Sequence, residues 1–516
     1  MKRSGALLMV DTLLQGGVDT CFTNPGTSEM HFVAALDQTP EMRSVLCLHE
    51  TVATGAADGY ARMADKPAGT LLHLGPGLAN GLANVHNARR AKTPMVNIVG
   101  EHATYHRHLD SPLTSDIEAI AASNSAWVRT TTRLENLGRD TAEAIAFAKS
   151  PPGNISTLIL PSDMAWTDLE EEAKVFAPAL PNEVPSDRIE AAARIAKQLG
   201  EKCLFVLSGL TLRDEGLNAI SKIAQATGAR FLAQGSNGRI ERGAERVFID
   251  RVRYPIPQAL DQLAGIEQVF LVNAVEPVGF FAYPGRPKRL FQNGCQIVEL
   301  AADDENGVAS LVAVADEIGG GFQAIHESYE ATDLPTGRLN PDNIAQTLAA
   351  LMPENAILAD ESITSGRGFF PYTKRTKPHT WLQGTGGAIG IGFPMATGAA
   401  MACPDRTVIA MQADGSGMYS CQALWTQARE NLNVKTIILS NRAYAILKGE
   451  MSNLGFDNPG PRARDMLTLD NPTINWPQLA NSMGVEAGRA ETAEELAKLL
   501  IAALKHDGPF LIEALL

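Results

Sequence analysis

The sequence of 516 residues predicts an α/β protein with three doubly wound parallel-sheet domains. Short apolar runs alternate with helical stretches along almost the whole chain, and continuous apolar strands of this kind indicate parallel sheets covered by helices on both faces. A chain of this length also exceeds a single core, since domains usually span roughly 100–200 residues. The predicted strands include those at 70–74, 95–100, 203–209, 268–274, 296–301, 356–361, 407–412 and 435–441.

Two stretches with the composition of linkers divide the chain. Residues 176–187 contain three prolines and little periodicity, and residues 331–341 end in Asn-Pro before a helical stretch. Cutting the chain at these stretches predicts an N-terminal domain at 1–175, a central domain at 186–330 and a C-terminal domain at 340–516.

Composition excludes several classes of protein. A net charge of -14 argues against a general nucleic-acid binder, which needs a positive surface for phosphate. The six cysteines form no CxxC motif, which favours reduced thiols in a cytoplasmic protein. No apolar run reaches the roughly 18 residues of a membrane span.

The N-terminus superficially resembles a signal peptide. Asp11 interrupts its apolar run, however, and the flanking apolar residues follow helical spacing, so an amphipathic first helix is the favoured interpretation. These residues are Ala6, Leu7, Val10, Leu13 and Leu14.

Near the C-terminus, a strand, a turn, a helix and a second strand follow one another. The turn Asp414-Gly415-Ser416 follows the strand at 407–412, and Asn441 ends the strand at 435–441. Parallel strands place Asp414 and Asn441 at one sheet edge, where ligands of such sheets bind. Carboxylate and amide oxygens suit Mg²⁺ held together with phosphate, and glycine lets backbone N–H groups approach phosphate. The alternative is an ordinary turn.

This segment resembles the metal-diphosphate motif of thiamine diphosphate enzymes. It departs from that motif at Ala413, which replaces a glycine, and at Ser440, which replaces an asparagine. The resemblance implies that Mg²⁺ is bound by Asp414, Asn441 and the carbonyl of Ala443. It also implies that Gly415, Ser416 and Tyr444 bind the cofactor, with Gly415 and Ser416 facing its diphosphate.

The glycine-rich segment at 384–394 contains no G-x-G-x-x-G, so the nicotinamide-dependent dehydrogenase is a disfavoured alternative. The segment resembles the loop that lines the aminopyrimidine in the same family. The resemblance implies that the Gly387 carbonyl accepts from the 4′-amino group and that Ile389 bends the cofactor. A packing loop between helix and strand is the structural alternative.

The segment at 47–67 places Glu50 where a strand meets a helix of small residues. It resembles the His-Glu … Ala-Asp-Gly-Tyr-Ala-Arg signature of the acetolactate synthase and benzoylformate decarboxylase group. The resemblance implies that Glu50 hydrogen-bonds N1′ of the aminopyrimidine, where a carboxylate that shares a proton promotes the cofactor's own deprotonation. A solvated helix start is the alternative.

Two further segments, 24–29 and 73–96, fit the same group. By resemblance, Thr27 aligns with a substrate-contacting serine of benzoylformate decarboxylases, and His73 aligns with a histidine used in proton transfer. Asn80 follows a Gly-Pro-Gly turn, as is common in the group. A structural role for His73 remains the alternative.

The chain lacks two acids found in relatives. The second active-site histidine of benzoylformate decarboxylases is replaced by Phe281 or Ala282, and Leu447 stands near the position of an acid in pyruvate decarboxylases. Slow protonation near the reacting carbon favours capture by a second carbonyl, and hence carboligation. No clear flavin signature is present, so FAD is not expected.

The segment at 100–118 contains His102, His106 and His108. Histidines four residues apart on a helix can bind Zn²⁺, but no clear pattern of carboxylate or cysteine partners accompanies them. A loop at the mouth of the site that meets a carboxylate substrate, or a solvated surface loop, is favoured.

These observations together predict a cytoplasmic enzyme that depends on thiamine diphosphate and Mg²⁺ and acts on a small 2-oxo acid. Decarboxylation with C–C bond formation, as in acetolactate synthase, is the leading interpretation. The alternatives are a simple 2-oxo acid decarboxylase and a non-catalytic relative. The resemblance implies a cofactor between Glu50 of one subunit and Asp414 and Asn441 of another, and hence at least a homodimer, with a homotetramer expected.

Overall fold

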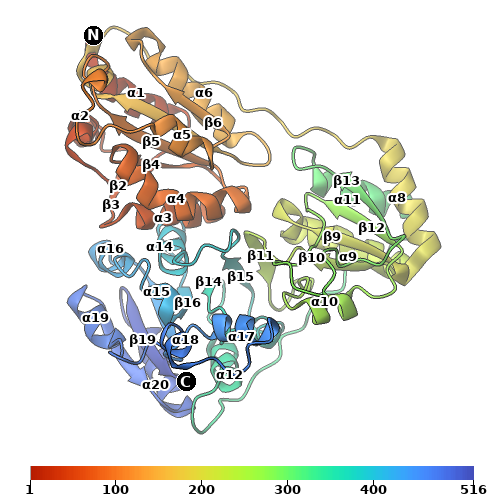
Figure 1. The fold of residues 1–516 in the computed structure, drawn as a ribbon. Coiled ribbons are helices and arrows are strands. Elements are labelled where there is room, and N and C mark those ends of the chain that lie inside the picture. The colour runs from red at the N-terminus through yellow and green to blue at the C-terminus, as the bar shows by residue number, and fades with distance from the viewer. Residues whose placement is uncertain (1) are drawn as a thin grey trace.

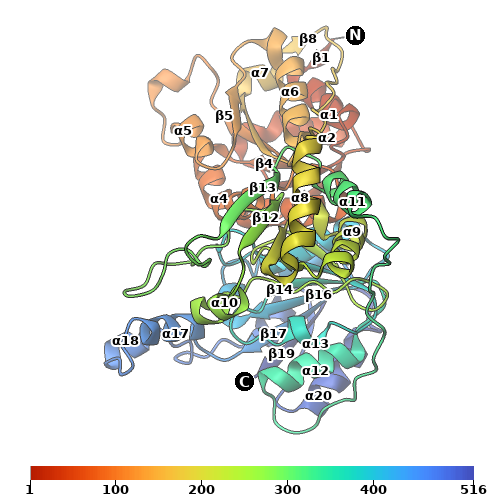
Figure 2. The same ribbon diagram turned by 90° about the vertical axis from the view of Figure 1, so that its right-hand side faces the viewer.

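A computed structural model describes residues 2–516 as three units, each a twisted sheet with helices on both faces (Figure 1). The predicted fold class is confirmed. The N-terminal and C-terminal sheets face each other across a layer of helices, while the central sheet lies to one side. A view turned by 90° shows the extended segment between the N-terminal and central units running along the outside (Figure 2).

The N-terminal unit contains a six-stranded parallel sheet in the order β3-β2-β4-β5-β7-β6. Its strands are β2 (Thr20–Asn24), β3 (Arg43–Leu46), β4 (Ala68–Leu72), β5 (Met95–Glu101), β6 (Trp127–Thr130) and β7 (Ile155–Pro161). Its helices are α1 (Gly5–Gln15), α2 (Met30–Asp37), α3 (Glu50–Ala64), α4 (Leu74–Ala91), α5 (Ile117–Ala122), α6 (Leu137–Lys149) and α7 (Ser162–Trp166). A short antiparallel pair, β1 (Arg3–Ser4) with β8 (Asp168–Leu169), joins the two ends of this unit.

The central unit contains a four-stranded parallel sheet in the order β10-β9-β12-β13. Its strands are β9 (Cys203–Leu207), β10 (Arg230–Ala233), β12 (Gln268–Val272) and β13 (Gln296–Ala301). Its helices are α8 (Ser186–Leu199), α9 (Asp214–Thr227), α10 (Ile256–Gln262) and α11 (Gly307–Ile318).

The C-terminal unit contains a seven-stranded sheet in the order β11-β15-β14-β16-β17-β19-β18. Its strands are β11 (Arg239–Arg242), β14 (Ala356–Glu361), β15 (His379–Gln383), β16 (Val408–Ala413), β17 (Val434–Ser440), β18 (Glu486–Ala490) and β19 (Phe510–Leu515). Its longer helices are α12 (Pro341–Leu351), α14 (Gly392–Ala402), α17 (Ala445–Asn453) and α20 (Ala493–Ala503). Its shorter helices are α13 (Phe369–Tyr372), α15 (Asp414–Gly417), α16 (Ala423–Arg429), α18 (Pro461–Asp465) and α19 (Trp476–Ser482).

Strand β11 departs from the division expected from the sequence. It lies within the segment 186–330 but pairs antiparallel with β15 at the edge of the C-terminal sheet. Prolines and composition mark where a chain is flexible, and they carry no information about a short strand that leaves one unit to pair with another. The central segment therefore supplies part of the C-terminal sheet.

Helices α3 and α14 cross where the N-terminal and C-terminal units meet (Figure 1). Their backbones approach closely because glycines stand at the crossing. A Cβ atom on Gly398 would lie 1.8 Å from the Ala56 carbonyl oxygen, and one on Gly59 would lie 2.1 Å from the Met395 carbonyl oxygen. Both helices are almost entirely buried, as their small residues suggest.

Two local predictions can be compared with the structure. The amphipathic N-terminal helix is present as α1, with Ala6, Val10 and Leu13 buried. The helix expected after the Asp414 turn is shorter than predicted, because residues 418–422 form a turn and α16 begins only at Ala423, while the Asp414 turn itself is the short helix α15. None of the helices between residues 2 and 516 is long and apolar enough to cross a membrane.

Candidate active site

Asp414 and Asn441 lie together at the carboxyl edge of the C-terminal sheet. Strands β16 and β17 are parallel neighbours with Ala413 opposite Leu439, so the residues that follow them meet. The backbone N–H of Arg442 donates to Asp414 Oδ2 over 2.6 Å, and the N–H of Ala443 donates to Asn441 Oδ1 over 3.0 Å. The structure thus brings together the three residues predicted to bind the metal.

The turn at Asp414 is closed and buried. Gly415 donates its N–H to Asp414 Oδ1, and the Tyr444 ring covers Gly415 so closely that a Cβ there would lie 2.6 Å from Tyr444 Cε1. Ser416 Oγ accepts from Gln412 Nε2 over 2.7 Å. Burial raises the pKa of the Asp414 carboxyl, against the opposing effect of its backbone donors. A nearby cation would remove this cost of burying the charge.

A buried carboxylate that sequence reasoning missed, Glu361, holds the loop at 387–392. It accepts from the N–H groups of Gly390, Ile391 and Gly392, at 2.7, 3.2 and 2.8 Å, and from Gln412 Nε2 at 2.9 Å. Glu361 ends β14, and its only sequence signal is an acidic residue at the carboxyl end of an apolar strand. Within this loop, Gly387 has a φ of 78°, a left-handed conformation that favours glycine, and Ile389 is half-buried.

Glu50 begins helix α3 and is 7% exposed. His49 caps the helix by accepting from the Thr51 N–H, and Glu50 Oε2 accepts from Asn80 Nδ2 over 3.0 Å. Gly77 faces the other carboxylate oxygen, and a Cβ there would lie 2.9 Å from Glu50 Oε1. Glu50 is therefore a held carboxylate with one closely packed side, in contrast to the solvated helix start considered above.

His73 belongs to a small hydrogen-bonded group in the N-terminal unit. Its Nδ1 lies 2.8 Å from Glu29 Oε2 and 3.3 Å from Ser28 Oγ. Glu29 is buried and also accepts from the Gly26 N–H over 2.8 Å. Thr27 is exposed on the same 3-10 turn, one residue from this group. Glu29 was missed in the sequence, although it belongs to the segment at 24–29 that drew attention.

The positions that lack the acids of relatives hold exposed apolar side chains. Phe281 and Leu447 are both exposed, and Ala282 follows Phe281. The neighbouring Phe280 lies over Gly387, where a Cβ would be 3.0 Å from Phe280 Cζ. Phe280, the residue before Phe281, thus stands next to the loop predicted to line the aminopyrimidine.

The histidines of the 100–118 segment lie in a loop beyond the carboxyl end of β5. His102 and His106 rings are 5.7 Å apart, and His102 Nε2 lies 3.1 Å from Ser111 Oγ. Arg107 lies 3.4 Å from the buried Glu101 carboxylate. Among residues 2–516, no group of three or more His, Cys, Asp or Glu side chains is arranged to hold a metal ion. The structure gives a zinc site at this loop no support.

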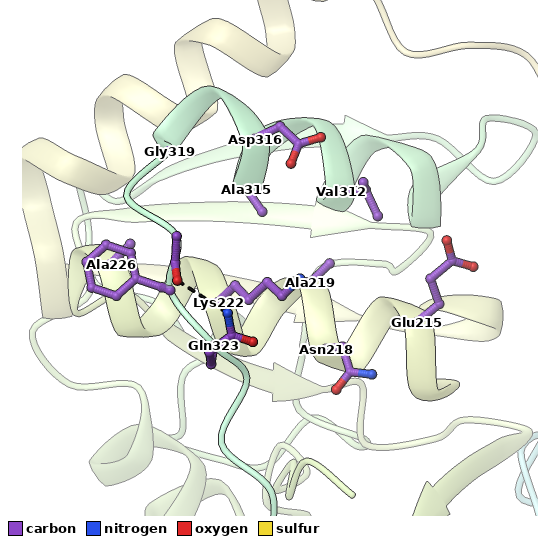
Figure 3. Close-up of a pocket in the computed structure, with 12 residues that line it drawn as sticks. Glu215, Asn218, Ala219, Lys222, Ala226, Val312, Ala315, Asp316, Gly319 and Gln323 are labelled. Carbon is purple, nitrogen blue, oxygen red and sulfur yellow. Dashed lines mark hydrogen bonds between the residues drawn. The ribbon is translucent and has the colours of Figure 1, made fainter.

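Two pockets border the central unit. A groove of about 760 Å³ runs between α9 and α11 beside Lys222 and Asp316 (Figure 3), and none of the predicted site residues lines it. A cleft of about 400 Å³ lies between the N-terminal and central units, beside the turns that follow β9, β12 and β13. Its Lys92 and Arg213 are paired with Asp303 and Asp65.

Comparisons with known proteins bear on this arrangement. Residues 3–122 match the thiamine pyrophosphate enzyme N-terminal TPP-binding domain, and residues 365–514 match the C-terminal TPP-binding domain. A Mycobacterium tuberculosis protein named "Putative acetolactate synthase large subunit IlvX" is 47% identical over 99% of this chain and 98% of its own length. This chain belongs to the thiamine pyrophosphate-dependent enzyme family.

More distant relatives of the family agree with this assignment. Benzoylformate decarboxylase of Pseudomonas aeruginosa is 27% identical over 98% of this chain and 97% of its own length. Among solved structures, a 4-hydroxybenzoylformate decarboxylase of Rhodococcus jostii superposes with a TM-score of 0.85 at 23% identity, covering 99% of each chain. Benzoylformate decarboxylase of Polynucleobacter necessarius gives a TM-score of 0.83 at 21% identity, covering 100% of this chain and 98% of its own. These two structures establish the likeness of fold.

Proposed function

We propose that this thiamine diphosphate enzyme requires Mg²⁺ and acts on a 2-oxo acid, which it decarboxylates with formation of a new C–C bond. The observation that carries the proposal is the meeting of Asp414, Asn441 and Ala443 at one sheet edge, together with the buried Glu50 at the start of α3. The relative named as a putative acetolactate synthase large subunit supports C–C bond formation as the outcome of the reaction.

The donors at the C-terminal edge suit a magnesium diphosphate. Each oxygen of Asp414 accepts one backbone N–H and keeps a lone pair for a cation, as does Asn441 Oδ1. Hard oxygen ligands that leave room for phosphate oxygens are what Mg²⁺ prefers. Asp414, Asn441 and the Ala443 carbonyl would hold the metal, and Gly415 and Ser416 would face the diphosphate.

When bound, thiamine diphosphate supplies a carbon nucleophile for the 2-oxo group and an electron sink for the loss of CO₂. Glu50 shares a proton with N1′ of the aminopyrimidine, and the Gly387 carbonyl accepts from its 4′-amino group. Ile389 orients the aminopyrimidine by contact. These roles follow from the family resemblance, and the burial of Glu50 and the left-handed φ of Gly387 support them.

His73 and Thr27 are proposed to contact the substrate from the N-terminal unit. His73 moves a proton at the substrate oxygen, and Glu29 fixes the ring by accepting from Nδ1 when that nitrogen carries the proton. The opposite nitrogen, Nε2, is then the one that accepts or donates toward substrate. Thr27 lies beside this pair with its side chain exposed.

Carboligation is preferred over simple decarboxylation because the residues that stand in place of those acids, Phe281 or Ala282 and Leu447, cannot donate a proton. Without an acid there, proton delivery to the carbon that has lost CO₂ is slow, and a second carbonyl compound can react at that carbon instead. A simple 2-oxo acid decarboxylase remains the second candidate, favoured by the similarity to benzoylformate decarboxylases.

We further propose that the active enzyme is at least a homodimer and that its site is shared between chains. Among residues 2–516, no hydrogen bond joins Glu50 to Asp414, Asn441 or the Gly387 loop within the chain. Apolar side chains are exposed beside both half-sites, including Leu48 at 44% and Tyr419 at 53%. A second copy would cover them and complete the cofactor site, which is the reason for an isologous contact.

The cleft between the N-terminal and central units supports the expectation that no flavin is bound there. Lys92 pairs with Asp303, Arg213 pairs with Asp65, and Arg239 donates to Glu241 over 2.8 Å. A dinucleotide diphosphate would have to compete with these carboxylates for Lys92, Arg213 and Arg239, three of the five basic residues that line the cleft. We expect purified protein to show no flavin absorption band.

Product analysis tests the proposed reaction. The protein is given thiamine diphosphate, Mg²⁺ and a panel of 2-oxo acids, with and without aldehyde acceptors, and the products are identified by mass spectrometry. We expect CO₂ release together with a condensation product. This product is a 2-hydroxy ketone where an aldehyde is the acceptor, and a 2-hydroxy-3-oxo acid where a second 2-oxo acid is the acceptor. Fast aldehyde release without condensation would contradict carboligation and favour the simple decarboxylase.

Glu50→Gln separates an enzyme from a non-catalytic relative. The amide cannot share a proton with N1′ as a carboxyl does, so turnover should fall by roughly 100-fold or more while the cofactor still binds. If neither the wild type nor the variant turns over substrate while both bind the cofactor, a binding or regulatory role would be favoured. Tight binding of NAD by the wild-type protein would instead revive the dehydrogenase alternative.

A further inference from the structure

A pocket of about 330 Å³ lies where the central unit meets helix α17. Its central wall consists of residues 254–258, with Phe280, Tyr283 and Arg286. Its other wall consists of Thr364, Arg367 and the α17 face that includes Ala445, Ile446, Gly449, Glu450 and Asn453. It is a pocket between two domains, the usual setting for a small-molecule site.

The pocket adjoins the residues proposed to hold the cofactor. Ser365 Oγ accepts from Asn441 Nδ2 over 3.3 Å, and Ser365 lies between the two lining residues Thr364 and Arg367. Phe280 lines the pocket and also covers Gly387. A substrate whose carbonyl carbon is at the cofactor therefore has this pocket within reach of its side chain.

One side of the pocket is aromatic. The Tyr254 and Phe280 ring centroids are 5.5 Å apart, and Phe280 packs edge-on against Phe281 at 4.9 Å. Tyr254, Phe280 and Phe281 are all exposed by more than two fifths of their surface. Such a wall favours the carbon chain of a bound molecule.

The same pocket carries an unbalanced positive charge. Glu450 accepts from the Tyr283 hydroxyl, and this contact together with burial raises the pKa of Tyr283. Arg367 lies 6.0 Å from the Tyr254 ring centroid. Among residues 2–516, neither Arg286 nor Arg367 forms an ion pair with a carboxylate. Two guanidinium groups thus face one carboxylate, and that carboxylate already has a hydroxyl partner.

We propose that this pocket selects 2-oxo acids whose side chain ends in a carboxylate. Arg367 binds that distal carboxylate, with Arg286 adding to the positive field, and the Tyr254 and Phe280 rings flank the carbon chain between the two ends of the substrate. Planar guanidinium groups recognise carboxylates through paired hydrogen bonds. The inference rests on the proposed function and makes Arg367 a specificity-determining residue of the same site.

Kinetics on paired substrates test the assignment in the holoenzyme. The ratio of kcat/KM for 2-oxoglutarate to that for 2-oxopentanoate, and the same ratio for 2-oxoadipate and 2-oxohexanoate, isolates the distal carboxylate. We expect the wild type to favour the dicarboxylic acids and Arg367→Gln to lower the ratio by roughly tenfold or more, mainly through KM. Arg462→Gln, in an exposed residue of α18 outside the pocket, should leave the ratio unchanged.

Binding of unreactive acids gives a readout that is independent of turnover. Calorimetric titration of the holoenzyme with glutarate and with pentanoate should show tighter binding of glutarate, lost in Arg367→Gln and kept in Arg462→Gln. Turnover of neutral or aromatic 2-oxo acids without any preference for glutarate would overturn the pocket assignment while the proposed reaction stands. Glutarate binding that depends on Arg367, in a protein that turns over none of the 2-oxo acids, would uphold the pocket and contradict the reaction.

Discussion

Two buried carboxylates, Glu361 and Glu29, hold the backbone around the candidate site. Glu361 accepts from three successive N–H groups at 390–392, and Glu29 accepts from Gly26 while it contacts His73. Neither is expected to touch the reacting atoms. Glu361 holds the loop that carries Gly387 and Ile389, and Glu29 holds His73, so we regard both glutamates as positioning residues.

Glu361→Gln should weaken the binding of thiamine diphosphate by roughly tenfold. The N–H donors share two carboxylate oxygens in the wild type but would have a single accepting oxygen in the amide, and each charge-assisted hydrogen bond contributes about 1.5–3 kcal/mol. Titration of the cofactor into the apoprotein, followed by intrinsic fluorescence, measures the change. Glu354→Gln provides a matched control, since Glu354 is exposed just before the same strand. Equal affinities of the two variants would contradict the assigned role.

His379 should make stability sensitive to acid. Burial lowers the pKa of His379 to about 3, so the unfolded chain binds a proton below its ordinary pKa of 6.5 that the folded chain does not. Stability therefore falls as the pH drops below about 6.5, by roughly 2 kcal/mol at pH 5. His379→Gln should lose less thermal stability than the wild type between pH 7 and pH 5. The same acid loss in both proteins would show that other groups are responsible.

At the scale of elements, the crossing of α3 and α14 fixes how the N-terminal and C-terminal units meet. Glu50 begins α3, and the loop held by Glu361 leads into α14. Asn87 Nδ2 adds a hydrogen bond to the Ala388 carbonyl over 2.9 Å. Elements that carry the candidate cofactor residues are thus tied together through buried backbone and small side chains.

Gly398→Ala should disturb this crossing, because the added Cβ would lie 1.8 Å from the Ala56 carbonyl oxygen. We expect a loss of about 1–3 kcal/mol, the usual cost of overpacking, and a lower thermal unfolding midpoint. Gly449→Ala is the control for a glycine within a helix, since a Cβ there meets nothing within 4 Å and improved helix propensity should leave stability equal or higher. Equal midpoints of the two variants would contradict a tight crossing.

The sequence anticipated the elements better than their partners across the fold. Asp414 and Asn441 could be placed together because consecutive parallel strands end at one edge of a sheet, and this geometry is confirmed. The contact between Glu29 and His73 depends on how β2 and β4 pair, which periodicity does not encode. Strand β11 was missed because four residues give no periodic signal and their partner β15 lies in another unit.

At the scale of the whole molecule, the candidate site has two halves on different units. The N-terminal unit carries Glu50 and His73, and the C-terminal unit carries Asp414 and Asn441. The exposed apolar residues beside both halves favour completion by a second copy, as proposed above. A shared site has a consequence that can be measured without a structure of the assembly.

Two inactive variants, Glu50→Gln and Asp414→Ala, should complement each other. In a mixed dimer one site receives both defects and the other receives neither, so co-expression should restore up to about half of the activity per mixed dimer, because an isologous dimer has two equivalent sites. Tagging each variant differently allows the mixed dimer to be purified and assayed. A mixed dimer as inactive as its parents would show that each site is formed within one chain.

Strand β11 also has a consequence for how the chain is made. Its partner β15 is synthesised long after it, and at the usual rate of translation the interval is on the order of ten seconds. During that time the central segment has left the ribosome with one strand unpaired, so its final structure waits for the C-terminal sheet. The central segment is therefore no free-standing insert: a truncated or excised version of the protein would leave either β11 or the edge of β15 open to pairing with other chains.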